Sequence, residues 1–397
     1  MTRLLMTAGK GGVGKTTVAA ATAVALADLG RRTLVMSIDS AHNLADVLGV
    51  DVGSVPTPVA DRLFALEVDL NRELTQNWDA VMGFFRALSG SNPLVTDLAA
   101  EESAVFPGME ELFGLCRILD LAESGDFDVV VIDAPPTGDF LKLLRLPEVM
   151  RWFVERTHPF DRGFLNKVRP IAQALSFPTP SEAALEQMDR WYLRVLQVSQ
   201  LLADPRRSAI RLVMTPDDIA LAEARRGWSW CSLFGVQVAG VVVNRILPEA
   251  DYPEPIRSWY PRQQAVLLEA EAAFGGLPVL RAPLQSESVI GVERLRRLAQ
   301  FLFDGSDPYT DDVVEPAQTW EDAADGPCLR IRIPALRRGA FRLLSGRDGL
   351  TLVVDNQRRV IPLPLSARTR TIRSARYQDD WLTVQFSAHH GGPIRAS

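Results

Sequence analysis

Residues 9–16 read Gly9-Lys10-Gly11-Gly12-Val13-Gly14-Lys15-Thr16, and this short stretch sets the fold class. It matches the pattern GxxxxGK[ST] of a phosphate-binding loop, in which glycines let backbone N–H groups point inward around a phosphate. The apolar run at 4–8 predicts a buried strand before the loop, and the Ala-rich run at 18–29 predicts a helix after it. Phosphate binding needs this order, because the helix N-terminus adds a positive end. The stretch therefore predicts a P-loop that binds a nucleotide.

The polar residues of the loop have different expected roles. Lys15 is expected to reach the β- and γ-phosphates, and the Thr16 hydroxyl is expected to ligate Mg²⁺. The predicted ATP-binding residues of this stretch are Gly9, Lys10, Gly11, Gly12, Val13, Gly14, Lys15, Thr16 and Thr17. Lys10 is a second lysine that an ordinary P-loop does not need. It is conspicuous because the chain has only four lysines, at positions 10, 15, 142 and 167.

Short apolar runs recur after the P-loop at a spacing typical of βαβ units. Further strands are predicted at 33–38, 127–132, 210–214, 236–243 and 278–280. Helical segments separate these runs, and the two longest, at about 61–126 and 140–202, are predicted to be helical insertions. Strands that alternate with helices imply a mainly parallel sheet with right-handed crossovers. Residues 1–305 are therefore predicted to form an α/β P-loop NTPase domain.

The sequence pattern changes after this domain. Residues 306–326 are acidic and are predicted to be a linker. Residues 327–397 contain short β-type runs separated by turns, which predicts a small all-β sandwich. This part holds 13 arginines and four acidic residues, a formal charge of +9, whereas the rest of the chain carries −15. The basic surface is expected to rest against the acidic body, and no nucleic-acid partner is expected, because no aromatic stacking motif accompanies the arginines.

Composition argues against several classes of protein. The three cysteines (Cys116, Cys231 and Cys328) lie far apart without a CxxC pair, so neither zinc nor an iron–sulfur cluster is expected. No apolar run is long enough to span a bilayer, so no stable membrane insertion is expected. The chain is therefore predicted to be a soluble cytoplasmic protein.

Two aspartates follow predicted strands. Asp39 ends the run at 33–38, and Asp133 ends the run at 127–132. Ligands of open α/β sheets bind beyond the carboxyl ends of the strands. Both carboxylates are therefore predicted to approach the P-loop.

The motifs resemble one family of P-loop ATPases. The box at 10–16 is similar to the deviant Walker A motif of the signature-lysine ATPases. The segment 39–46, DSAHNLAD, resembles switch I of the arsenite-pump ATPases and the tail-anchored-protein targeting ATPases. The segment 133–138, DAPPTG, resembles their switch II, DTAPTGH. Ser40 replaces a proline and Asp139 replaces a histidine of these motifs, which puts in doubt the rigidity of switch I and any role of that histidine.

The resemblance implies a division of work in a homodimer. Lys10 would cross to the partner's phosphates and neutralise charge in the transition state, so that Lys10, Lys15 and Asp39 would be the catalytic residues. Asp39 would orient or deprotonate the attacking water, and Asn43 would sense the γ-phosphate side. Thr16, Asp39 and Asp133 would surround Mg²⁺, partly through water.

Weaker similarities continue downstream. Asn244 lies in a segment, 240–245, that resembles the strand whose asparagine reads the adenine. Glu223 lies where relatives have an acidic residue, and Pro283 begins a segment that resembles the one flanking their base. The basic tail resembles the α-crystallin-like, small-heat-shock-type sandwich that some bacterial and plastid members carry.

The resulting prediction is a homodimeric ATPase that opens and closes a surface for a hydrophobic protein client. Apolar residues of the insertions are candidates for that surface: Trp78, Met82, Phe84, Phe85, Trp152, Phe153, Phe160 and Phe164. One alternative is a subunit of an arsenite pump, although residues 99–106 lack the cysteine that relatives have there. Another is a nucleotide-switched binding module with vestigial hydrolysis.

Overall fold

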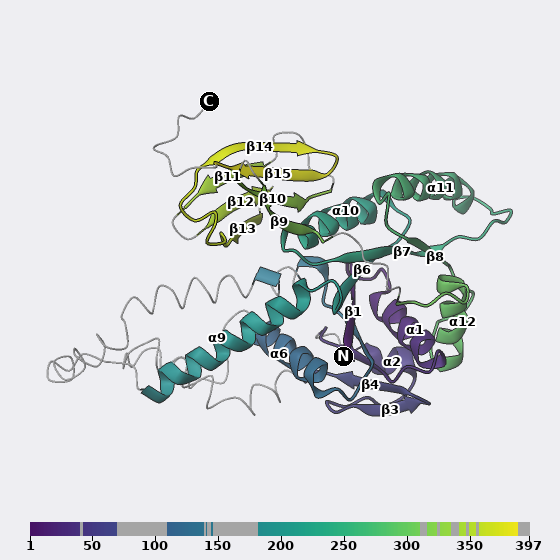
Figure 1. Ribbon diagram of the computed structural model, residues 1–397. Helices are drawn as coiled ribbons and strands as arrows, with labels where there is room; N and C mark the ends of the chain where they lie inside the picture. Colours follow the sequence, from purple (N-terminus) through teal and green to yellow (C-terminus); the bar gives the residue numbers. More distant parts are fainter. Residues whose placement is uncertain are drawn as a thin grey trace, which may run out of the picture. The chain divides into compact units, whose positions relative to one another are not determined.

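Figure 1 shows a computed structural model of the chain. The residues that the structure describes are 1–39, 43–69, 109–138, 140, 144–145, 182–309, 316–323, 326–334, 341–346, 349–354 and 357–387. The chain divides into two compact units. The first comprises Met1–Glu67, Gly125–Leu141 and Leu202–Ser397, and the second comprises Val68–Ser124 and Lys142–Leu201.

The first unit is built on an eight-stranded sheet in the order β3-β4-β2-β5-β1-β6-β7-β8. Its strands are β1 (Arg3–Ala8), β2 (Thr33–Ser37), β3 (Thr57–Ala60), β4 (Leu63–Glu67), β5 (Val129–Asp133), β6 (Ser208–Met214), β7 (Val238–Ile246) and β8 (Val279–Pro283). All neighbouring pairs are parallel except β3 and β4, which are antiparallel. The predicted α/β fold with a mainly parallel sheet is confirmed.

β1 lies in the middle of this sheet and leads into the P-loop. It pairs with β5 on one side, where Thr7 is opposite Asp133, and with β6 on the other. Because the strands are parallel, their carboxyl ends gather at one edge of the sheet, which is where ligands of open α/β sheets bind. The P-loop and the ends of β2, β5, β6 and β7 therefore meet at this edge.

The predicted helical segment at 61–126 is wrong at its beginning. Leu63–Glu67 form β4, which pairs in parallel with β2, and Thr57–Ala60 pair with β4 as β3. A short apolar run such as residues 63–66 does not distinguish a buried strand from a buried helix by periodicity. The free edge of β2 decides, because the N–H and C=O groups of an unpaired strand favour the addition of a further strand.

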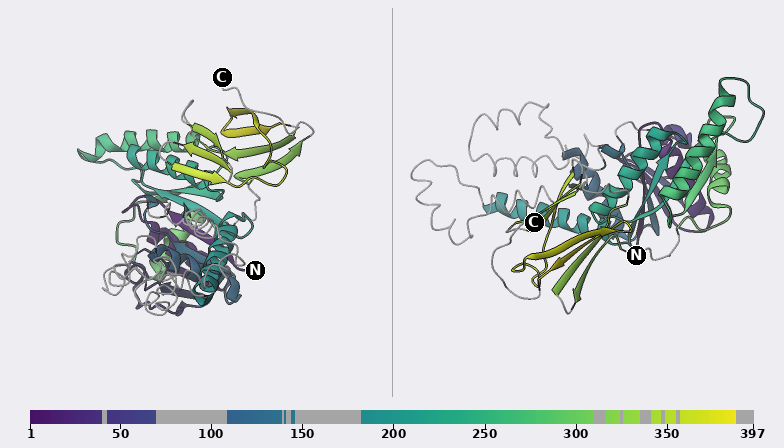
Figure 2. Two further views of the ribbon diagram at one scale, coloured as in Figure 1. Left: turned by 90° about the vertical axis from the view of Figure 1, so that its left-hand side faces the viewer. Right: turned by 90° about the horizontal axis from the view of Figure 1, so that it is seen from above.

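Helices cover both faces of the sheet (Figures 1 and 2). They are α1 (Lys15–Asp28), α2 (Leu44–Leu48), α10 (Asp218–Leu233), α11 (Ile256–Ala273) and α12 (Val292–Phe303). The chain crosses from β1 towards β2 but from β6 in the opposite direction to β7, so right-handed crossovers place α1 and α10 on opposite faces. Leu295, Leu298 and Leu302 of α12 join α1 in one buried apolar cluster, which covers the helix that follows the P-loop.

The second unit contains α6 (Met109–Ser124) and most of α9 (Glu182–Ala203). Arg194 of α9 donates a hydrogen bond from Nη2 to Oδ1 of Asp120 in α6 over 2.5 Å. The candidate client-surface residues at 78–85 and 152–164 lie outside the described residues, as do Ser40 and Asp139. Among the described helices, none is long and apolar enough to cross a membrane.

The C-terminal part is all β, as predicted. One antiparallel sheet has the order β14-β15-β10-β9, and a second has the order β11-β12-β13. The strands are β9 (Gln318–Ala323), β10 (Gly326–Arg332), β11 (Phe341–Ser345), β12 (Leu350–Val354), β13 (Gln357–Ile361), β14 (Ile372–Gln378) and β15 (Trp381–Phe386).

Two features of this part differ from the sequence prediction. β9 lies within the predicted linker at 306–326, because this polar stretch gains its ladder of hydrogen bonds only by pairing with β10. β14 is absent from the predicted strands, because it has few apolar residues and its exposure pattern departs from alternation at Ala375 and Arg376. Its pairing with β15 also shifts register between Ile372 and Ser374.

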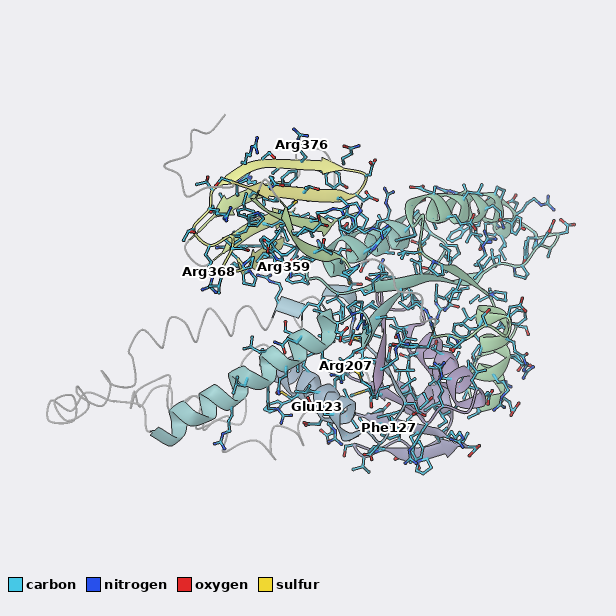
Figure 3. All side chains as sticks on the ribbon, viewed as in Figure 1. Glu123, Phe127, Arg207, Arg359, Arg368 and Arg376 are labelled. Carbon is cyan, nitrogen blue, oxygen red and sulfur yellow. The ribbon has the colours of Figure 1, made fainter. Side chains whose placement is uncertain are left out.

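The arginines of the C-terminal sheets fall into two groups. Arg376 on β14 and Arg368 in the turn after β13 are exposed (Figure 3). Arg359 on β13 instead lies over the ring of Phe234, with its guanidinium carbon 6.0 Å from the ring centroid. Since Phe234 follows α10, this part of the basic surface rests against the ATPase core.

One side chain of α10 completes the core between the C-terminal sheets. Leu233 is fully buried in an apolar cluster whose other buried members come from the C-terminal part, among them Leu329, Leu352 and Leu382. Ser229 also donates a hydrogen bond to the carbonyl of Pro334, and Arg332 lies over the ring of Trp228. The C-terminal sheets are therefore packed on α10.

The Leu233→Ala variant is expected to lower the free energy of unfolding by about 2–4 kcal/mol, because it leaves a cavity between α10 and the sheets. Leu365→Ala is the matched control, since Leu365 is 83% exposed. Urea unfolding followed by circular dichroism would measure both. Equal midpoints for the two variants would contradict the proposed packing.

Candidate nucleotide-binding site

The backbone of the P-loop depends on glycines at defined positions. Gly12 and Gly14 have positive φ angles of 83° and 93°, a conformation that glycine adopts without steric cost. A Cβ atom on Gly9 would lie 2.2 Å from the carbonyl oxygen of Val213, at the end of β6. Gly9 is therefore required because the neighbouring strand β6 approaches closely, and Gly12 and Gly14 are required by the turn itself.

The first turn of α1 places the functional side chains at the carboxyl edge of the sheet. Lys15 is only 6% exposed, so its ammonium group is held inside the site. Thr16 donates a hydrogen bond from Oγ1 to Oδ2 of Asp133 over 2.6 Å. Thr17 is half-buried in the same turn. The structure thus brings Thr16, in α1, to Asp133, at the end of β5; both were predicted to surround Mg²⁺ together with Asp39.

Asp133 is a buried carboxylate. Burial raises its pKa from 3.8 to about 6, although the Thr16 hydrogen bond and the charge of Lys15 act in the opposite direction. Its second oxygen, Oδ1, is buried and has no hydrogen-bond partner among the residues that the structure describes. A hydroxyl and a carboxylate with an unused oxygen form a donor set that suits Mg²⁺, directly or through water.

Ser37, the last residue of β2, is a site residue that the sequence prediction missed. Its hydroxyl donates to Oδ2 of Asp133 over 3.4 Å and accepts a hydrogen bond from the backbone N–H of Asp39 over 3.3 Å. One buried hydroxyl therefore joins the switch I aspartate to the switch II aspartate. The available signal was a small polar residue two positions before Asp39, directly after the apolar run at 34–36.

We expect Ser37→Ala to lower the kcat of ATP hydrolysis about 3–10-fold, because loss of one hydrogen bond costs about 1 kcal/mol. Steady-state turnover at saturating ATP and Mg²⁺ would measure the effect. Ser54→Ala, in a loop distant in sequence from both aspartates, serves as the control. An unchanged kcat for Ser37→Ala would show that the bridge does not contribute.

Lys10 is placed differently from Lys15. It is exposed on the loop, and it makes no hydrogen bond or ion pair with another residue that the structure describes. Switch II is nevertheless tied to the loop nearby, since the N–H of Thr137 donates to the carbonyl of Gly9 over 3.3 Å. The side chain of Lys10 thus remains available to a group outside its own chain's loop.

The other predicted residues are distributed around the edge. Asn43 is exposed at the N-terminus of α2, where its side chain makes no capping hydrogen bond. Glu223 is half-buried on α10, and Pro283 is the last residue of β8; within the described part of the chain, neither makes a hydrogen bond to the P-loop. Asn244 does: its Nδ2 donates to the carbonyl of Val13 over 2.8 Å.

Comparison with known proteins agrees with this arrangement. Residues 2–304 match the family described as "Anion-transporting ATPase". The chain belongs to this ATPase family. Residues 324–386 match a second description, "HSP20-like domain found in ArsA". The predicted family resemblance, including its C-terminal domain, is confirmed, and membership identifies the chain as an ATP hydrolase.

Relatives of this ATPase include proteins with two kinds of functional name. The chain is 30% identical over 398 residues to the "Putative arsenical pump-driving ATPase 1" of Aquifex aeolicus, covering 97% of this chain and 100% of that protein. It is 32% identical over 397 residues to the "Putative arsenical pump-driving ATPase" of Chlorobaculum tepidum, covering 98% and 97%. It is also 28% identical over 330 residues to the "ATPase ASNA1 homolog" of Trypanosoma cruzi, covering 77% and 91%.

Proposed function

We propose that this ATPase works as a homodimer and couples ATP hydrolysis to the opening and closing of a surface for a hydrophobic protein client. The observation that carries the proposal is the contrast between its two P-loop lysines. Lys15 is held inside the site of its own chain, whereas Lys10 is exposed. An exposed lysine beside the phosphates is suited to act on the site of a second copy.

Within one site, each residue has a distinct task. The loop N–H groups and Lys15 bind the β- and γ-phosphates of ATP, and Thr16 and Asp133 hold Mg²⁺, directly or through water. The metal would neutralise charge on these phosphates. Asp39, positioned by Ser37, orients the attacking water or accepts its proton. Lys10 of the second copy offsets the charge that develops in the transition state.

The remaining predicted residues are assigned to the outer part of the site. Asn43 senses the γ-phosphate side from the start of α2. Glu223, on the helix α10 that follows β6, and Pro283, at the end of β8, flank the base of ATP. These assignments rest on the motif similarities of the sequence.

The cysteines disfavour a metalloid pump. Cys116, Cys231 and Cys328 are all buried, and they lie on three different elements, α6, α10 and β10. Burial raises the pKa of Cys231 to about 12 and also raises the pKa of Cys328, so both thiols resist the thiolate form. Arsenite binding requires several thiolates in one place. Client handling is therefore preferred, and the relative named "ATPase ASNA1 homolog" supports that preference.

The decisive experiment is capture of a defined client. The purified chain would be mixed with a fluorescent peptide containing an apolar helix of about 20 residues, long enough to span a bilayer, with ATP, with ADP or without nucleotide. We expect retention that depends on the nucleotide, and none of a matched peptide with charged residues in the helix. Failure to retain the apolar peptide in all three states would overturn the client proposal.

Two further readouts separate the alternatives. Stimulation of ATP turnover by arsenite or antimonite would instead support the pump. Tight ATP binding without measurable turnover would support a nucleotide-switched binding module.

A further inference from the structure

The carboxamide of Asn244 is already engaged by the protein itself. Its Nδ2 donates to the carbonyl of Val13 over 2.8 Å, and its Oδ1 accepts the backbone N–H of Arg245 over 2.9 Å. The residue is 7% exposed. Both polar atoms of the side chain thus have protein partners at nearly ideal hydrogen-bond distances. These two bonds hold the amide plane and leave one N–H and one lone pair of the carboxamide for other partners.

The backbone around Asn244 fixes this orientation. Asn244 lies near the end of β7, and Arg245 has a positive φ of 59°, an uncommon conformation for a residue with a side chain. The Arg245 N–H donates to Oδ1 and holds the amide plane, so that Nδ2 faces the P-loop.

The P-loop is shaped to receive this amide group. A Cβ atom on Gly14 would lie 2.4 Å from Nδ2 of Asn244, so a larger residue would displace the amide. Gly14 is therefore constrained twice, by its positive φ and by contact with Asn244. The Val13 carbonyl is directed to Nδ2, away from the phosphates, and the N–H groups of the loop keep their inward orientation.

We infer that Asn244 is a positioning residue of the phosphate cradle: from strand β7, its side chain holds the peptide between Val13 and Gly14. This inference rests on the proposed ATP site. Asn244 acts on the phosphates through the loop. This role uses one N–H and one lone pair of the amide and does not depend on contact with a base. It is separate from the adenine reading that sequence similarity predicts.

The test separates phosphate affinity from base recognition. We expect Asn244→Leu, which keeps the volume and removes the donor, to weaken binding of ATP and of base-free tripolyphosphate by a similar factor, about tenfold. The preference for ATP over GTP should stay unchanged. Asn244→Ala is the second variant, in case the leucine disturbs folding. Gln237→Leu is the matched control, because Gln237 is a buried amide that precedes β7.

The outcome that overturns the inference is tripolyphosphate affinity within about twofold of wild type in both Asn244 variants. If a variant loses the preference for ATP over GTP but retains its affinity for tripolyphosphate, Asn244 recognises the base and does not position the loop. If the wild-type chain binds neither ATP nor tripolyphosphate, the proposed ATP site itself fails. In that case, amide hydrogen exchange of residues 9–14 in the nucleotide-free protein tests the role of Asn244 by itself. Faster exchange in Asn244→Leu than in the wild type supports Asn244 as a positioning residue of the loop, and unchanged exchange rejects this role.

Discussion

Lys10→Ala is expected to bind ATP and to hydrolyse it about 10³-fold more slowly than the wild-type chain, the effect typical of removing a cation that offsets transition-state charge. Lys10 is exposed, whereas Lys15 is buried in the site and is the lysine expected to bind the phosphates of its own chain. The affinity for ATP should therefore change little when Lys10 is removed. Turnover and ATP affinity, measured on the same preparation, would give the two effects separately. Lys15→Ala is the comparison, because it should weaken binding as well.

A mixing experiment tests whether Lys10 acts on the second copy. Lys10→Ala and Asp39→Asn chains should each be nearly inactive alone. If Lys10 acts in trans, a mixed dimer has one intact site, formed by Asp39 of the first chain and Lys10 of the second, and activity returns on mixing. If Lys10 acts within its own chain, no site is intact and the mixture stays inactive. The second result would remove the composite site, and with it the reason for a homodimer.

Asp133→Asn is expected to have opposite effects on activity and on stability. Turnover should fall by about 10²–10⁴-fold, because the carboxylate beside Thr16 is lost. Stability of the nucleotide-free protein at about pH 7.5 should rise by about 1–3 kcal/mol, because a buried carboxylate with an orphaned Oδ1 is removed. Asp217→Asn is the control, since Asp217 is an N-cap of α10 whose oxygen accepts the N–H of Ala220.

The pH dependence of this stability difference follows from the pKa of Asp133. Burial raises this pKa from an ordinary value of 3.8 to about 6 in the folded protein, so the folded state binds more protons than the unfolded state between these limits. Stability of the wild type therefore falls as pH rises from about 4 to 6, and the advantage of Asn grows over the same window. Urea unfolding at about pH 4.5, 6 and 7.5 would measure it. If the stability difference between Asp133→Asn and the wild type is independent of pH, burial of the carboxylate is not its cause. With Mg²⁺ and ATP added, the wild type should instead become the more stable of the two.

Much of the ATPase core was predictable because its signals are local. The P-loop needs glycines with positive φ, a lysine and a threonine within eight residues, and the strand and helix around it have clear apolar patterns. The aspartates at 39 and 133 were predictable because each ends an apolar run. Local signals failed at residues 63–67, where the free edge of β2 determines the structure, and at β14, which has few apolar residues and no strict alternation.

By itself, the sequence determined that this chain has a P-loop, a parallel sheet and a second lysine, Lys10, because these depend on residue types at short, fixed spacings. Only the tertiary structure decided which side chains of neighbouring elements contact one another. It joined Ser37 to Asp133, turned the amide of Asn244 onto Val13, and placed Leu233 of α10 in the core of the C-terminal sheets. These contacts link residues distant in the chain, so their energies depend on packing and burial, which no local pattern of residues encodes.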